Sequence, residues 1–183
     1  MASPHPINMR RLAKAWIDFN HAKTPLKRIF YEVKNELDQI LNGPGSTGYK
    51  IRLDEEDYSL SIKKEGRGPL IKAMQDEVVW VWIGISSYQT KLYLSLEIGF
   101  VEDTYGDRTR HFRKKALKCN FIATNYTHDK YDCEGYEKYR DLAVLLKDKQ
   151  DFRKQLAAVL KWVSRTAQDI SPLLKALEKD LEA

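Results

Sequence analysis

Apolar residues recur at helical spacing in the first part of the chain. Over residues 8–20 they fall three or four positions apart, and this spacing predicts an amphipathic helix. A second helix is expected to begin at Thr24, because Thr24 can cap it and Pro25 suits its first helical position. An unbroken apolar stripe follows, and Gly43 is expected to end it. The pattern therefore predicts a helical N-terminal part over residues 8–42.

Further along the chain the apolar positions alternate with a period of two, which is typical of β-strands. Alternation from residue 49 to residue 62 predicts a hairpin of two strands. Another strand is expected around residues 116–124, where alternate positions are again apolar. The predicted sheet occupies residues 49–124.

The most apolar stretch of the chain, residues 78–85, is hydrophobic on both sides. A strand of this kind is expected at the centre of a sheet and covered on both faces, with Trp80 and Trp82 in the core. Residues 92–101 alternate strictly and follow after a short polar connection. We therefore expect these two strands to pair antiparallel.

The last part of the chain returns to helical spacing, and residues 136–183 are expected to form helical pieces. The final stripe, from residue 172 to residue 181, suits a protein core as well as a dimer interface, so the sequence leaves the oligomeric state open. Short connections between strands favour an antiparallel sheet. We predict one α+β domain over residues 1–183, with a mainly antiparallel sheet of about five strands flanked by N-terminal and C-terminal amphipathic helices.

The composition adds a mild positive charge to this picture. The chain has 183 residues and a formal net charge of +5, and a positive balance favours acidic partners. It holds no apolar run of about 18 residues, and its first residues lack the apolar segment of a signal peptide. Cys119 and Cys133 do not make a disulfide framework. These features predict a cytoplasmic protein that makes no membrane contact.

The densest positive charge lies between residues 108 and 118, and Phe112 within it could stack on a base. More cations lie in the N-terminal helical part. The two groups would form one nucleic-acid-binding patch if the fold brought them together. The simpler interpretation is a solvated loop before an edge strand, where lysines prevent unwanted pairing. The candidate binding residues are Arg108, Arg110, Arg113, Lys114, Lys115, Lys118, Arg10 and Arg11.

Glu97 is an acid in the middle of an otherwise regular strand, and the surrounding arrangement is loosely like the core of metal-dependent nucleases. Those enzymes need a second acid on the preceding strand and a lysine two positions after an acid, to hold the metal and activate water. Here Glu97 is followed by Ile98 and Gly99, and residues 78–85 contain no carboxylate. An inactive nuclease-like domain is therefore a weaker hypothesis. The simpler interpretation is that Glu97 lies on the solvent side of the sheet and has no catalytic role.

No other pattern indicates catalysis or a metal. An imidazole, a thiol and carboxylates crowd into residues 128–134, but their spacing matches neither a zinc site nor a calcium loop. The chain also lacks a nucleophile elbow and a phosphate-binding glycine loop. The sequence thus predicts no catalytic residues, no cofactor and no metal, and it argues against an enzyme.

Several tyrosines lie outside the strongest apolar stripes, and tyrosine is enriched at protein interfaces. Tyr126, Tyr131 and Tyr136 are therefore predicted to contact a protein. The leading hypothesis is a non-enzymatic macromolecular binding protein that acts on a protein partner. It could be an inhibitor, or an immunity or anti-defence accessory factor of phage or mobile-element type. The alternatives are a nucleic-acid-binding protein that uses the basic patch and, second, the inactive nuclease-like domain.

Overall fold

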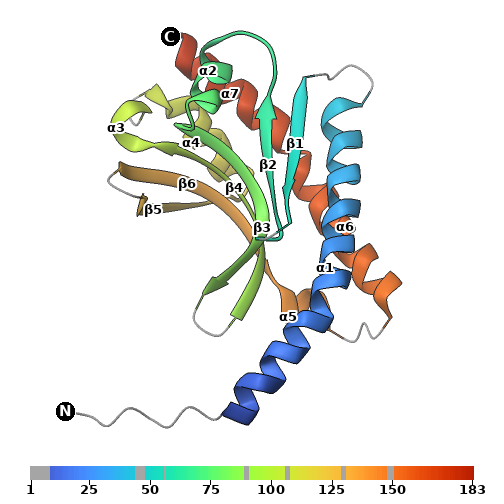
Figure 1. Cartoon of the computed structure of the whole chain (residues 1–183). Coiled ribbons are helices and arrows are strands. Elements are labelled where there is room, and N and C mark those ends of the chain that lie inside the picture. Colours follow the sequence, from blue (N-terminus) through green and yellow to red (C-terminus); the bar gives the residue numbers. More distant parts are fainter. Residues whose placement is uncertain are drawn as a thin grey trace, which may run out of the picture.

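Six antiparallel strands form one sheet, and helices lie against one of its faces (Figure 1). The computed structural model describes residues 9–43, 48–55, 57–88, 91–105, 108–128, 131–147 and 151–183. The strands are β1 (Tyr49–Asp54), β2 (Ser59–Lys64), β3 (Val79–Tyr88), β4 (Lys91–Val101), β5 (Ile122–His128) and β6 (Tyr131–Asp141). The helices are α1 (Met9–Asn42), α2 (Pro69–Gln75), α3 (Glu102–Tyr105), α4 (Arg110–Lys118), α5 (Leu142–Leu145), α6 (Phe152–Ala167) and α7 (Ile170–Glu182). The predicted α+β class is confirmed, with one strand more than expected.

The strand order is β1-β2-β3-β4-β6-β5, so the chain passes over one position before β5 and then returns to fill it with β6. The expected pairing of β3 with β4 is confirmed, and its register runs from Val79 opposite Phe100 to Tyr88 opposite Lys91. Because side chains alternate between the faces of a strand, this register places every apolar residue of the β4 alternation on one face.

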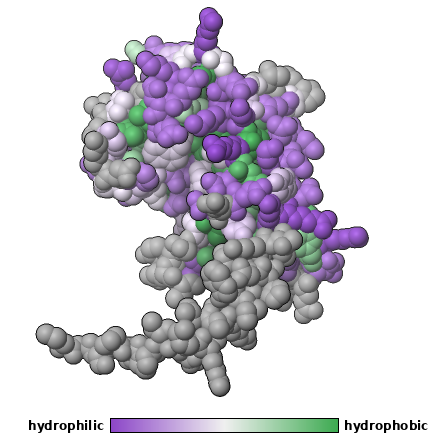
Figure 2. Space-filling model, viewed as in Figure 1, coloured by the Kyte–Doolittle hydropathy of each residue, from purple (hydrophilic) through white to green (hydrophobic). Residues whose placement is uncertain are grey.

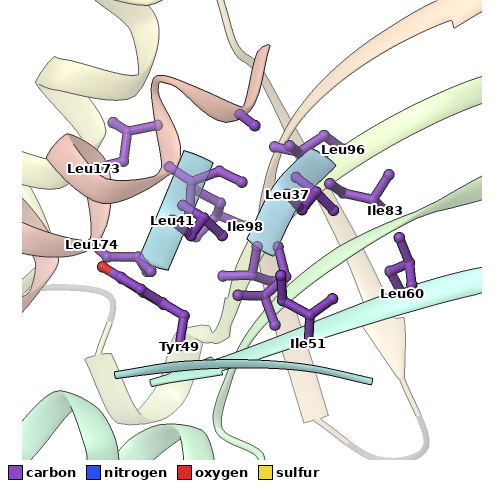
Figure 3. Close-up of a cluster of buried hydrophobic side chains, with 14 of the residues drawn as sticks. Leu37, Leu41, Tyr49, Ile51, Leu60, Ile83, Leu96, Ile98, Leu173 and Leu174 are labelled. Carbon is purple, nitrogen blue, oxygen red and sulfur yellow. The ribbon is translucent and has the colours of Figure 1, made fainter. Parts of the chain in front are cut away.

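The core lies between this face and the helices. Ile83, Leu96 and Ile98 are fully buried on it. Figure 3 shows them beside Leu37 and Leu41 of α1 and beside Leu173 and Leu174 of α7. In Figure 1, α7 passes behind β1 and β2, and α1 contacts both β1 and α6. Burial of each such leucine or isoleucine contributes about 1.5–3 kcal/mol.

The N-terminal part is one helix and not two. Helix α1 continues from Met9 to Asn42 and passes through Pro25. The proline ring fixes φ near the helical value, so the feature that predicted a helix start also fits a helix interior at the cost of one hydrogen bond. At the other end of the chain, Leu177 in the final stripe is fully buried, so this stripe serves the core.

Two further predictions are wrong between residues 110 and 141. Residues 110–118 form helix α4, because Phe112 and Ala116 stand four positions apart and are both buried, whereas Leu117 of the expected strand is 56% exposed. The helical C-terminal part does not begin at residue 136, because β6 continues to Asp141 in register with β4. There the Asp141 carboxylate accepts a hydrogen bond from the N–H of Ala143 (2.8 Å) and caps α5.

Candidate functional site

The face of the sheet opposite the core reaches solvent along all six strands. We call it the open face. The expectation that β3 is covered on both faces is wrong, since Trp80 and Trp82 lie on the open face and are only partly buried. Strand alternation and the register place these side chains there: Lys50, Arg52, Ser61, Lys63, Trp80, Trp82, Tyr93, Glu97, Ile122, Tyr126, Tyr131, Cys133, Glu137 and Tyr139.

Two indole rings lie flat on the open face, each over a glycine. A methyl group added to Gly99 would overlap the ring of Trp80, and one added to Gly84 would overlap the ring of Trp82. Gly99 faces Trp80 directly across the β3–β4 pair. The glycines thus provide room for broad rings against the backbone, which holds the rings in place while part of each stays exposed.

Glu97 joins two of the aromatic side chains. Its carboxylate accepts hydrogen bonds from Nε1 of Trp80 (3.0 Å) and from the hydroxyl of Tyr126 (2.5 Å). The two rings meet edge to face, with centroids 6.4 Å apart. Burial, followed by the hydrogen bond to Glu97, raises the pKa of Tyr126, so this hydroxyl remains a donor at neutral pH.

A second carboxylate stands beside Glu97. Glu137 faces it directly across the β4–β6 pair, and burial together with the charge of Glu97 raises the pKa of Glu137. Within the described residues no three metal-binding side chains come together, at this pair or elsewhere. Lys138, the lysine next in sequence, turns to the other face and pairs with Asp169 (2.7 Å). The carboxylate of Glu97 therefore holds two aromatic side chains, and the lysine next to Glu137 in sequence faces away from the pair of carboxylates.

A groove of about 1130 Å³ crosses the open face where β3 begins and β4 ends. Cations of β1 and β2 line one side, and rings from β5 and β6 line the other. Lys63 pairs with Glu77 at the rim (3.5 Å), whereas Lys50 and Arg52 are exposed and have no ion-pair partner among the described residues. In Figure 2, apolar (green) atoms show between hydrophilic (purple) ones on the upper part of the molecule. Among the residues that line the groove are Lys50, Arg52, Lys63, Trp80, Tyr126 and Tyr131.

The groove also contains a cysteine. Burial raises the pKa of the Cys133 thiol, which therefore stays protonated at neutral pH. A protonated, buried thiol is a poor nucleophile, so Cys133 belongs to the apolar floor of the groove.

The predicted basic patch is split by the structure. Arg108 is exposed, and so are four residues of α4, a helix that packs against α7: Arg110, Lys114, Lys115 and Lys118. Arg113 differs from them, because it forms an ion pair with the buried carboxylate of Glu134 and its guanidinium lies over the ring of Phe100. Arg113 therefore supports the fold and is not free to bind a ligand.

Helix α4 is held in place by α7. Asp180 is 4% exposed, and its carboxylate accepts the N–H of Phe112 (2.7 Å) and contacts Nδ1 of His111 (2.5 Å). A carboxylate at the first turn of a helix satisfies a free N–H and complements the helix dipole. Since this anchor fixes α4, the exposed cations of α4 occupy a defined surface.

The other basic group lies elsewhere. Arg10 and Arg11 stand in the first turn of α1, where side chains lie outside the described part of the structure. Figure 1 shows that turn at the opposite end of the molecule from α4. The two groups therefore do not form a single patch.

The three predicted contact tyrosines separate as well. Tyr126 and Tyr131 lie on the open face, 36% and 48% exposed. Tyr136 is 3% exposed, and its hydroxyl donates to Glu134 on the core side (2.5 Å), so it is not available to a partner. Positions 131 and 136 differ by an odd number, and strand alternation places them on opposite faces. With a helix expected from residue 136, this difference was not visible in the sequence.

Sequence reasoning also missed Lys50, Arg52 and the exposed edges of Trp80 and Trp82. Alternation showed that Lys50 and Arg52 share a face, but which strands lie beside them depends on pairings between distant segments.

In comparisons with protein-family models, with curated proteins and with solved structures, nothing matches this chain. The function is therefore inferred from the geometry of the site. Across the described residues, no helix combines the length and the apolar character that are needed to cross a membrane.

Proposed function

We propose that this protein is a non-enzymatic binding protein whose open face holds a protein partner. The observation that carries this proposal is where the exposed apolar side chains gather. Eight large hydrophobic side chains in the described residues are exposed, and four of them share the β5–β6 part of the open face. These four are Ile122, Tyr126, Tyr131 and Tyr139. Exposed large apolar side chains gathered on one face are typical of protein interaction sites.

The rings of the open face are held in position before any partner binds. Trp80 is fixed by Gly99 and Glu97, and Tyr139 packs edge to face on Tyr93 with centroids 5.2 Å apart. Side chains that are already ordered lose little conformational entropy on binding. Tryptophan and tyrosine are also enriched among the residues that contribute most to interface energy. The open face thus has the composition and the order of a protein-binding surface.

The test is capture of partners from a nuclease-treated lysate of the native host. The double variant Tyr131→Ser, Tyr139→Ser removes two exposed rings of the open face. Tyr31→Ser is the matched control, because Tyr31 is 44% exposed on α1, which packs on the core side of the sheet and not on the open face. We expect the double variant to lose the main captured protein at least about tenfold, since each interface tyrosine contributes on the order of 1 kcal/mol. Equal recovery by the double variant, or equal loss in the control, would contradict the proposal.

A single-stranded nucleic acid is the second candidate, and the unpaired cations Lys50 and Arg52 in one groove with Trp80 and Tyr126 favour it. Cations that follow a backbone, beside rings that stack on bases, are the usual elements of such sites. This candidate predicts that Lys50→Glu with Arg52→Glu abolishes binding of an oligothymidine strand. Lys114→Glu with Lys115→Glu on α4 is the control. No retardation of the strand at low salt removes the candidate.

The narrower hypothesis of an inhibitor or immunity factor concerns the identity of the partner. It predicts that the captured protein is a toxin or a defence protein whose activity falls when the complex forms. The activity of the purified partner, measured with and without an excess of this protein, tests it. A partner with unchanged activity would leave binding without inhibition and would contradict this hypothesis.

A further inference from the structure

The sheet ends in two edge strands that are protected very differently. At β1, the side-chain amide of Asn42 accepts the N–H of Tyr49 (2.9 Å) and donates to its carbonyl oxygen (2.8 Å). Strand β1 also carries Lys50, Arg52 and Asp54 at alternate positions, and α1 packs against it. Charged residues and covering elements prevent a foreign strand from pairing with an edge. Strand β5 contains no lysine, arginine, aspartate or glutamate at all.

The hydrogen-bond pattern of the sheet shows which backbone groups of β5 point outward. Successive residues of an antiparallel strand direct their N–H and C=O groups to opposite sides. The N–H of Val101 bonds to the carbonyl oxygen of Val78, so Val101 faces β3 and Phe100 faces β6. Phe100 is in register with Glu134. Glu134 therefore faces β4, and its neighbour Gly135 faces β5.

Gly135 is in register with Thr124, so Thr124 directs its backbone groups inward to β6. By the same alternation, the N–H and C=O groups of Ala123, Asn125 and Thr127 point outward, where no strand of the described residues pairs with them. Their side chains are exposed. The outer edge of β5 is thus a row of backbone donors and acceptors open to another strand.

The two sides of this edge differ in chemistry. On the open face, Ile122 and Tyr126 of β5 are 50% and 36% exposed, and they continue into Tyr131 and Tyr139 of β6. On the other side, α4 contacts β5 and presents exposed cations without ion-pair partners among the described residues. A strand added at the edge would find an apolar surface on one side and positive charge on the other.

We propose that an extended, acidic segment of a protein partner adds to the sheet as an antiparallel strand beside β5. Its alternate side chains would be acidic toward α4 and apolar toward the open face. Main-chain hydrogen bonds supply the affinity in such strand addition, and the alternating side chains supply the specificity. This inference rests on the proposed function, since the apolar half of the contact is the open face.

A second copy of this chain fits the edge less well. Each copy carries a net charge of +5, and pairing β5 with β5 would place both cationic α4 helices on the same side of one continuous sheet. The like charges of the two α4 helices would repel each other, except where salt screens them. A nucleic acid offers no backbone amides, so it cannot pair with the edge. Charge complementarity therefore favours an acidic protein segment.

The probe is a labelled peptide of alternating valine and glutamate, about as long as β5, measured by fluorescence anisotropy against the full chain. In an antiparallel pair, the residue opposite Asn125 shares its face and directs its own N–H back to β5. Those residues are the glutamates. N-methylation of the glutamates therefore blocks pairing, whereas N-methylation of the valines leaves it intact. A valine–lysine peptide is the charge control.

The protein variants follow the same logic. Asn125→Pro removes an outward N–H and no sheet hydrogen bond, so we expect peptide affinity to fall at least about tenfold with little change in melting temperature. Thr124→Pro removes an inward N–H and is expected to destabilise the sheet itself. Lys115→Glu with Lys118→Glu is expected to weaken the acidic peptide several-fold and to strengthen the lysine peptide.

Three results would overturn the proposal. The first is an acidic peptide that does not bind, and the second is binding that neither Asn125→Pro nor N-methylated glutamate weakens. The third is a dimer of the full chain that sediments as such and is lost in Asn125→Pro, which would make a second copy the occupant. None of these results affects the outcome of the lysate capture with the Tyr131→Ser, Tyr139→Ser variant. The proposed function is therefore tested separately from this inference.

Discussion

The same six strands form both faces of the sheet, but the two faces differ in residue type and in burial. On the core face, the aliphatic residues at alternate positions of β3 and β4 include Val81, Ile83, Leu96 and Ile98, which are buried under the helices. On the open face, tryptophan, tyrosine and glutamate hold one another in place and stay partly exposed. The need to bury apolar side chains in the core explains the aliphatic composition of the core face. On the open face, large aromatic side chains stay partly exposed and contribute less to folding, and exposed tryptophan and tyrosine are the basis of the proposed binding function.

The largest expected effect is on the core face. Leu96→Ala removes a fully buried side chain from the central strand pair, where helices and neighbouring strands leave little room for collapse. We expect a loss of about 2–5 kcal/mol in the free energy of unfolding, measured by urea denaturation. The matched change on the open face, Tyr139→Ala, should cost less than about 1 kcal/mol, because Tyr139 is 46% exposed. Equal costs would contradict the division between the faces.

Gly99→Ala tests whether the lack of a side chain at Gly99 lets the Trp80 ring lie against the backbone. The added methyl group overlaps the indole, so the ring must leave its place or the strands must shift. We expect a loss of about 1–3 kcal/mol in unfolding free energy and a red shift of tryptophan emission. In the double variant Gly99→Ala, Trp80→Ala the two losses should not add, because the clash is gone. If the losses in unfolding free energy of the two single variants simply add, Gly99 does not hold the Trp80 ring in its position.

Glu97→Gln tests the hydrogen-bonded centre of the open face. The amide oxygen can still accept from Trp80 and Tyr126, but without the negative charge each bond is weaker. We expect a loss of about 1 kcal/mol in unfolding free energy. The pKa of Tyr126 should fall while burial keeps it above the ordinary value, which ultraviolet titration can follow. Glu77→Gln at the rim is the control, and it should leave the titration unchanged.

The smallest expected effect is a gain in stability from Glu137→Gln. The pKa of Glu137 is raised in the folded protein, so the folded state binds the proton more tightly than the unfolded chain. Stability contributed by this group therefore falls as pH rises from the unfolded pKa through the folded pKa, and it stays reduced above both. In the Glu137→Gln variant no carboxylate has to ionise at this position, and the repulsion between Glu137 and Glu97 is gone. We therefore expect the free energy of unfolding to rise by less than about 1 kcal/mol near neutral pH.

The pH dependence is the check on Glu137. The gain should shrink as pH falls below the ordinary glutamate pKa of about 4.3, where both states carry the proton. Thermal unfolding of wild type and variant at several pH values measures it. A gain that is equal at all pH values would show that packing, and not the charge, is responsible.

The sequence predicted the parts of the fold that a single strong period defines. Strict alternation in β4 and the long stripe of α1 were read correctly as a strand and a helix. The prediction failed between α4 and β6, because α4 and β6 mix charged and aromatic residues and neither shows a clear apolar period. Its true assignment depends on the tertiary contacts of Phe112 and on the pairing of β6 with β4.

The candidate site was predicted only in fragments for the same reason. Tyr126 and Tyr131 were identified by type, but Trp80 was assigned to the core, because an apolar stripe does not show whether a layer covers it. The groove brings together residues from β1 to β6, and this depends on a strand order that local patterns do not encode. The cations of α4 were found as a run of charge, and their separation from Arg10 and Arg11 required the fold.

The central claim is that partners bind at the open face, and site-specific photo-crosslinking tests it most directly. A benzophenone side chain replaces Tyr139 on the open face in one variant and Tyr31 on α1 in another, two positions that are 46% and 44% exposed. Both proteins are irradiated in the native host lysate. We predict a crosslinked protein partner from position 139 that is absent from position 31. Crosslinks from position 31 alone, or the same products from both positions, would contradict the claim.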